Sequence, residues 1–262
     1  MTGLQQAAAT VAAIPELQIN PRLEIDMVAV TEAYDCAVVD DFLLNPADLV
    51  EFACAEAGRF SMPERAYPGT ILNLPNAAMA PLYRFFRSEF SRLFSFCRGG
   101  IDFYTQLSIT TLQPADFSWI QRLCHTDPKL ANGRRNFAAL LYLFENPALG
   151  GTGFYRWRDP QYWAEMSALQ VEDPDAGLAQ LQERFQMFRD PPRYMTVSNE
   201  AADLIDRVPA RFNRLVFYSG ELPHSAYIEQ PELLSDDPAR GRLTLNCFAS
   251  VLPKMASGPG SV

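Results

Sequence analysis

In the stretch Cys124-His125-Thr126-Asp127, a histidine and an aspartate stand two positions apart, and the apolar run from Phe137 to Phe144 follows. In a β-strand, residues two positions apart point to the same face of the sheet. His125 and Asp127 can therefore offer an imidazole nitrogen and a carboxylate oxygen to one point in space. Two histidines and one carboxylate form the ligand set that binds non-haem Fe(II) and leaves coordination positions open.

The chain contains two histidines, and the second is His224 in Leu222-Pro223-His224-Ser225. It follows the apolar run from Leu215 to Tyr218, so it also stands near the end of an expected strand. An H-x-D tripeptide alone is a weak signal, and by itself favours an ordinary histidine beside a turn. The order of the neighbouring motifs changes that interpretation.

Four further motifs accompany the H-x-D along the chain. They are the run Leu140-Leu141-Tyr142-Leu143-Phe144-Glu145-Asn146-Pro147, the turn Gly150-Gly151-Thr152-Gly153-Phe154, the run Arg214-Leu215-Val216-Phe217 before His224, and the run Gly241-Arg242-Leu243-Thr244-Leu245. In this order they resemble the Fe(II)/2-oxoglutarate-dependent dioxygenase superfamily, specifically its prolyl-4-hydroxylase-like branch. The likeness spans roughly residues 104–250, and a weaker match at Val39-Asp40-Asp41-Phe42-Leu43 extends it upstream.

The resemblance implies a metal centre that is also the catalytic centre. Its three ligands to Fe(II) would be His125, Asp127 and His224. Relatives that halogenate carry a small residue in place of the carboxylate ligand, so Asp127 favours hydroxylation. The chemistry would consume O₂ and convert 2-oxoglutarate to succinate and CO₂.

The resemblance also implies a site for the co-substrate, 2-oxoglutarate. Its distal carboxylate would meet Arg242, with Thr244 as a hydroxyl partner and Tyr142 as a second contact. Arginine suits this role because its planar guanidinium matches a carboxylate in two parallel hydrogen bonds. Arg240 is the alternative, and the strand phase together with the R-x-T match favours Arg242.

The substrate stays open in this interpretation. The motifs favour, slightly, a peptidyl or amino-acid substrate among small-molecule or peptidyl ones. Two alternative functions remain: a non-catalytic 2-oxoglutarate- or metal-binding module with a sensing role, and a metal cupin of another chemistry.

The composition excludes several kinds of partner. The net charge of −9 argues against nucleic-acid backbones and anionic membrane surfaces, which attract Lys and Arg. Five cysteines without a C-x-x-C pair suit a reducing compartment, and no apolar run reaches the length of a membrane helix. We therefore expect a cytoplasmic protein that binds neither nucleic acid nor membrane, with an oligomeric state left open.

The apolar periodicity predicts a mainly β core. Strands are expected in the runs at 103–112, 137–144, 215–218 and 243–251. Short strands separated by Gly, Pro and Asn favour a jelly roll or double-stranded β-helix, cupin-like and α+β overall. Flanking helices are expected at about 45–58 and 79–97, and a helical insertion at about 159–190.

The expected organisation is a single oxygenase domain. It spans residues 37–254 and includes the flanking helices and the insertion. An N-terminal tail and lead-in at 1–36 precede it, and a C-terminal tail at 255–262 follows.

Overall fold

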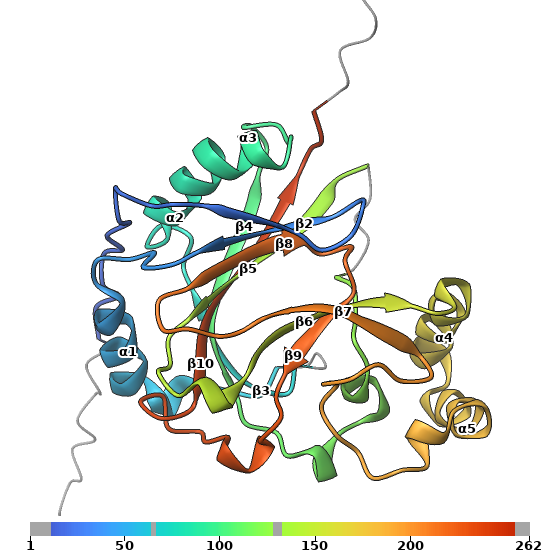
Figure 1. The fold of residues 1–262 in the computed structure, drawn as a ribbon. Helices are drawn as coiled ribbons and strands as arrows, with labels where there is room; N and C mark the ends of the chain where they lie inside the picture. Colours follow the sequence, from blue (N-terminus) through green and yellow to red (C-terminus); the bar gives the residue numbers. More distant parts are fainter. Residues whose placement is uncertain (1–11, 64–66, 128–132, 255–262) are drawn as a thin grey trace, which may run out of the picture.

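The computed structural model describes residues 12–63, 67–127 and 133–254. In this part of the chain, antiparallel strands form one sheet of seven and one of three (Figure 1). The larger sheet contains, in spatial order, β1 (Asp26–Ala29), β2 (Asp35–Val39), β8 (Leu215–Ser219), β5 (Arg135–Tyr142), β10 (Arg242–Val251), β4 (Asp102–Thr110) and β3 (Gly69–Leu74). The smaller sheet contains β7 (Ala202–Val208), β6 (Gly151–Trp157) and β9 (His224–Tyr227).

The path of the chain between the two sheets is that of a double-stranded β-helix. From β4 the chain crosses to His125, which forms an isolated bridge with His224 at the edge of the smaller sheet, and returns to β5. It then crosses to β6 and β7, returns to β8, crosses to β9 and returns to β10. The expected jelly-roll core is therefore confirmed, and so is the α+β class.

The N-terminal part of the chain also joins the core. β1, which lies within the segment assigned to the lead-in, pairs with β2 at the edge of the larger sheet. Leu17 is buried in the same hydrophobic cluster as the helices. The tail residues 1–11 and 255–262 lie outside the described residues, and the single-domain boundaries at 37 and 254 stay a prediction.

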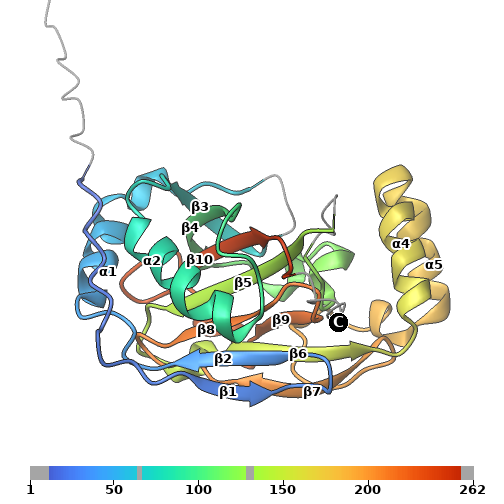
Figure 2. The same ribbon diagram turned by 90° about the horizontal axis from the view of Figure 1, so that it is seen from above.

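Helices cover the outer face of the larger sheet (Figure 2). α1 spans Pro46–Ala55, and the helical segment expected at 79–97 consists of α2 (Ala80–Phe85), a π-helical turn (Phe86–Phe90) and α3 (Ser91–Leu93). It ends earlier than expected because Ser95 adopts a positive φ of 53°. Short 3₁₀ turns occur at Ala57–Arg59, Pro114–Asp116, Trp119–Arg122, Pro147–Leu149, Gln186–Phe188 and Pro231–Leu233.

The insertion between β6 and β7 forms two further helices, α4 (Pro160–Glu172) and α5 (Pro174–Arg184), which stand beside the sheets in Figure 2. Each begins with proline after an aspartate whose side chain accepts a hydrogen bond from the helix backbone, an arrangement that stabilises a helix start. Asp173 ends α4 and caps α5, which explains the break between them. None of the helices in the described ranges combines the length and the apolar character that crossing a bilayer requires.

Alternation along β10 separates two environments. Leu243, Leu245 and Cys247 face the helices and belong to the large apolar cluster. Arg242, Thr244 and Asn246 alternate with them and therefore face the gap between the sheets. The interior of the double-stranded β-helix is thus more polar along this strand than its outer face.

Phe217 of β8 is central to the cluster on the helix side. Its ring stacks on Phe90 at a centroid distance of 4.1 Å and on Phe137 at 5.1 Å. Because the side chain is fully buried, we expect Phe217→Ala to lower the free energy of unfolding by about 3–5 kcal/mol. Urea denaturation measures the loss, and Leu44→Ala, at a side chain that is 60% exposed, should change the value by less than about 0.5 kcal/mol. Equal effects of the two substitutions would contradict this packing.

Candidate metal centre

Backbone pairing brings the two histidines together from distant parts of the chain. The amide of His125 donates to the carbonyl of His224, and the amide of His224 donates to the carbonyl of His125, both at 2.9 Å. Two residues further on, the amide of Asp127 donates to the carbonyl of Gly220 at 2.8 Å. With the backbone held in this way, one ligand atom each from His125, Asp127 and His224 lies within 4.8 Å of the others.

The local backbone around His125 differs from the expected strand. Instead of a regular strand, the structure has a single bridge at His125, with irregular backbone on both sides. His125 and Asp127 still converge because each is hydrogen-bonded separately to the segment from Gly220 to His224. Cys124 packs in another direction, with Tyr155, in a small buried cluster, so its role is packing.

The surroundings keep both imidazoles neutral near pH 7. Burial lowers the pKa of His224 to about 4. Loss of contact with water around the ring also lowers the pKa of His125 to about 4, and the neighbouring His224 adds to the effect. Part of the side chain nevertheless remains accessible to solvent. Burial raises the pKa of Asp127, an effect that His125 opposes. Neutral imidazoles are the form that binds metal ions.

Hydrogen bonds orient the donor atoms. The Nδ1 of His224 lies 2.8 Å from the carbonyl oxygen of Leu222. A carbonyl can only accept, so Nδ1 carries the proton and Nε2 keeps its lone pair for a ligand. The Oδ2 atom of Asp127 is buried and has no hydrogen-bond partner among the described residues. Two neutral imidazoles and one unpartnered carboxylate oxygen fit the donor set of a non-haem Fe(II) site.

Because residue 220 is a glycine without a Cβ atom, the side chain of Asp127 can lie directly against its backbone. A Cβ atom at position 220 would lie 2.3 Å from Oδ2 of Asp127 and 2.8 Å from its Cβ. The sequence signal for this requirement is the glycine itself, at the end of β8 and four positions before His224. Its importance for the site could not be read without knowing that Asp127 packs against it.

Arg242 lies in the interior, with 2% of its surface exposed. Its guanidinium donates to the carbonyls of Leu149 at 3.1 Å and Gly151 at 2.8 Å, and to the hydroxyl of Thr110 at 3.2 Å. Within the described ranges no salt bridge joins Arg242 to a carboxylate. The alternative, Arg240, has an 80% exposed side chain and pairs with Asp237 at 2.8 Å.

The other two predicted co-substrate residues surround Arg242. Thr244 is fully buried, and its hydroxyl oxygen has no hydrogen-bond partner in the described part of the chain. The hydroxyl of Tyr142 lies 2.6 Å from that of Thr152, and the guanidinium carbon of Arg242 lies 5.9 Å from the centroid of the Tyr142 ring. The structure therefore places all three residues in one buried region, and their role with 2-oxoglutarate stays a prediction.

Tyr67 is a neighbour that sequence reasoning missed. Its hydroxyl lies 3.0 Å from the hydroxyl of Thr110, which also accepts from Arg242. Burial raises the pKa of Tyr67, and the charge of Arg242 opposes this rise. The sequence Pro68-Gly69 after this tyrosine indicates a loop. A loop signal does not reveal that the tyrosine side chain points into the interior.

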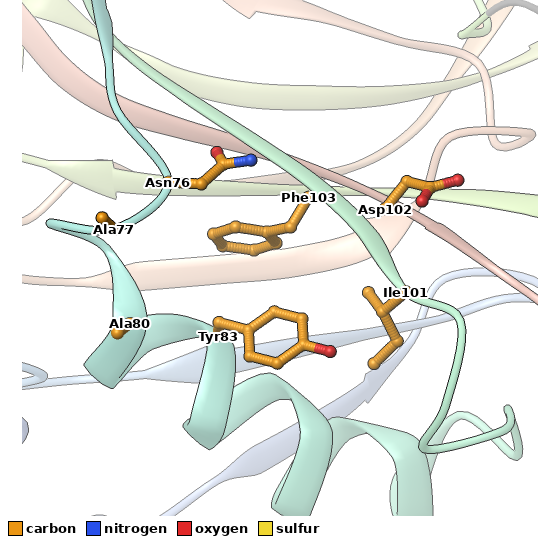
Figure 3. A pocket seen from close by; sticks show the side chains of 7 residues that line it. All are labelled: Asn76, Ala77, Ala80, Tyr83, Ile101, Asp102 and Phe103. Atoms are coloured by element: carbon orange, nitrogen blue, oxygen red, sulfur yellow. The ribbon is translucent and has the colours of Figure 1, made fainter.

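Two surface hollows lie apart from the three ligands. The first, of about 470 Å³, lies between α2 and the start of β4, on the helix side (Figure 3). It is lined by Asn76, Ala77, Ala80, Tyr83, Ile101, Asp102 and Phe103. The second, of about 300 Å³, includes Arg122 and Met195, and the sulfur of Met195 accepts from the amide of Cys124 at 2.7 Å. The second hollow therefore borders the segment that carries His125, but none of the three candidate metal-binding residues lines it.

The chain was compared with known protein families, with curated proteins and with solved structures. The model of a family described as "Family of unknown function (DUF6445)" matches residues 21–249. None of the curated proteins matches the chain.

Solved structures that are similar to it include the following three. A prolyl-4-hydroxylase of Pseudomonas putida has 17% sequence identity and a TM-score of 0.39, covering 84% of this chain and 93% of that one. EvdO2 of Micromonospora carbonacea var. aurantiaca, complexed with 2-oxoglutarate, has 11% identity and a TM-score of 0.37, covering 86% and 89%. HygX of Streptomyces hygroscopicus, with nickel, 2-oxoglutarate and hygromycin B bound, has 12% identity and a TM-score of 0.40, covering 87% and 90%.

The contact between Gly220 and Asp127 allows the candidate centre to be tested without removing a ligand. Gly220→Ala should displace Asp127 and weaken Fe(II) binding by about 10–100-fold, the usual effect of disturbing a residue that supports a metal ligand. Anaerobic calorimetry with Fe(II) measures the affinity, and circular dichroism checks the fold. Gly58→Ala is the matched control, because a Cβ there meets no atom within 4 Å. Unchanged affinity in Gly220→Ala would show that Asp127 does not bind the ion.

Proposed function

We propose an Fe(II)- and 2-oxoglutarate-dependent oxygenase function, with hydroxylation as its outcome, for this chain, which belongs to the DUF6445 family. The observation that carries the proposal is the convergence of His125, Asp127 and His224 within 4.8 Å. A double-stranded β-helix holds this cluster, which extends from the exposed His125 to the buried His224, and a buried arginine with no acidic partner among the described residues lies between the same two sheets.

In this proposal the three ligands hold Fe(II), and the iron with 2-oxoglutarate supplies activation of O₂ coupled to decarboxylation. His224 presents Nε2 because its Nδ1 donates to Leu222. Asp127 contributes the anionic oxygen and fills the position that a halide would need, which favours a hydroxylated product. The exposed surface of His125 leaves one side of the centre accessible to a small-molecule or peptidyl substrate.

Arg242 provides the reason to prefer 2-oxoglutarate over other metal ligands. A guanidinium buried with neutral acceptors alone is unfavourable unless an anion completes its surroundings. A carboxylate bound there would accept two parallel hydrogen bonds. A dicarboxylate with one end on the metal and the other at Arg242 meets both requirements, which a metal cupin with an incidental arginine does not explain.

The proposal predicts a spectroscopic signature of chelation. Anaerobic addition of Fe(II) and 2-oxoglutarate together should produce a visible charge-transfer band, and Fe(II) alone should not. His224→Ala should abolish the band because it removes one of the three ligands. Admission of O₂ should then release succinate, slowly even without substrate.

Other outcomes would favour the other functions. A band from Fe(II) alone, or none, would support a metal cupin of other chemistry. Chelation of 2-oxoglutarate without any succinate release, tested with peptide and metabolite pools, would support a sensing module.

The buried arginine gives the next prediction. Arg242→Ala should raise the concentration of 2-oxoglutarate needed for the band by a factor that corresponds to about 2–5 kcal/mol, the usual cost of removing one partner of a buried charge pair. Metal affinity should stay within a few-fold, and Arg242→Lys should recover part of the loss. Arg240→Ala is the matched control, since that side chain is exposed. If Arg240→Ala shows the loss and Arg242→Ala does not, the assignment is wrong.

A further inference from the structure

The inner faces of β4 and β10 carry a row of side chains that we name the polar strip. It consists of four directly opposed pairs: Thr110 with Arg242, Ser108 with Thr244, Gln106 with Asn246, and Tyr104 with Phe248. The first three pairs are buried, each member with at most 6% of its surface exposed. Six polar residues in the core of a sandwich are unfavourable unless each finds a hydrogen-bond partner.

Among the described residues, the hydrogen bonds along the strip leave two side-chain oxygens without a partner, the hydroxyl of Thr244 and the amide oxygen of Asn246. Tyr104 donates through its hydroxyl to the carbonyl oxygen of the Gln106 side chain, and the amide nitrogen of Gln106 donates to Ser108 Oγ at 3.0 Å. The amide nitrogen of Asn246 donates to the same Ser108 Oγ at 3.1 Å. The Oδ1 atom of Asn246 is buried and has no partner in the described ranges.

Strand register places this open acceptor close to the level of the metal centre. Phe248 and Tyr218 both pair with Ala138, and the ring of Tyr218 lies 4.8 Å from the ring of His224. Phe248 therefore marks the level of His224 along the strands. Asn246 lies two residues further toward Arg242, on the same inner face.

The 2-oxoglutarate dianion cannot donate the hydrogen bond that the Oδ1 atom of Asn246 lacks. At neutral pH its keto oxygen and two carboxylates only accept hydrogen bonds, and Asn246 Oδ1 also only accepts. The open atom requires a donor, such as a hydroxyl or an amino group. An acidic group at the same place would set acceptor against acceptor, in a chain whose net charge is already −9.

We infer that Asn246, held by Ser108, accepts a hydrogen bond from a hydroxyl or amino group of the substrate, so that the substrate presents a donor at this place and neither an apolar nor an acidic group. This inference rests on the proposed function and deepens it. Tyr104, whose side chain is 42% exposed and stacks on Phe248 at 5.2 Å, forms the outer end of the strip. The strip thus leads from an aromatic pair, exposed at Tyr104 and half-buried at Phe248, to the buried amide.

The test measures binding to the protein loaded with Co(II) and 2-oxoglutarate, through changes in the visible absorption of the cobalt. The probes are polyols, amino sugars and diamines, each paired with its O-methyl or quaternary N-methyl derivative, which lacks the donor. Donor-bearing probes should bind about tenfold or more tightly than their methylated partners, as expected for a buried acceptor that needs a partner. Asn246→Leu should abolish this preference, and Asn246→Asp should retain it.

Controls separate this inference from the proposed function. Asn76→Leu, at an exposed amide on the helix side, should leave the preference unchanged, and thermal melting checks that each variant is folded. Equal binding of paired probes, no response to any donor-bearing probe, or a preference that survives Asn246→Leu would overturn the inference while chelation of metal and 2-oxoglutarate persists. Loss of chelation in the unmodified protein would instead contradict the proposed function.

Discussion

The reciprocal backbone pairing of His125 and His224 is the interaction on which the site depends. Two hydrogen bonds of 2.9 Å attach the segment before β5 to the edge strand of the smaller sheet. Together with the bond from the amide of Asp127 to the carbonyl of Gly220, they fix the chain between β4 and β5 relative to β9. The same pairing places two imidazoles side by side, with ring centroids 4.4 Å apart, so the geometry of the fold and that of the candidate metal centre have one cause.

The segment that carries His125 is also supported from outside the barrel. Leu123 is buried in an aromatic cluster with Trp163 and Phe185 of the insertion, whose rings stack at 5.5 Å. Cys124 donates its amide to the sulfur of Met195, and the carbonyl of Met195 accepts from Tyr155 of β6 at 2.6 Å. The insertion and the segment after it therefore pack directly behind the first ligand, and both contribute to its position.

The two faces of the larger sheet perform different tasks. On the helix side, stacked phenylalanines and aliphatic residues supply apolar burial, which is the main favourable term in folding. The inner face of β10 instead buries Arg242, Thr244 and Asn246, and the side-chain oxygens of the last two have no hydrogen-bond partner among the described residues. Polar groups left incomplete in a core oppose stability, and such departures from ordinary core composition are expected where a chain binds a ligand.

Local sequence determined much of this protein. The period of two predicted strands β4, β5, β8 and β10, whereas the expected turn at Gly150–Phe154 is mostly strand β6. The order of H-x-D, distal histidine and R-x-T named residues that the structure brings close together or buries between the sheets. The R-x-T match favoured Arg242 over Arg240, and the structure separates the two because β10 begins at Arg242, whereas Arg240 lies before the strand, exposed and paired with Asp237. Tertiary structure decided what depends on contacts between distant segments. Neither the space that Gly220 leaves for Asp127, nor the approach of Tyr67 to Thr110, nor the open amide oxygen of Asn246 has a local pattern, since each arises where strands and loops remote in sequence pack together.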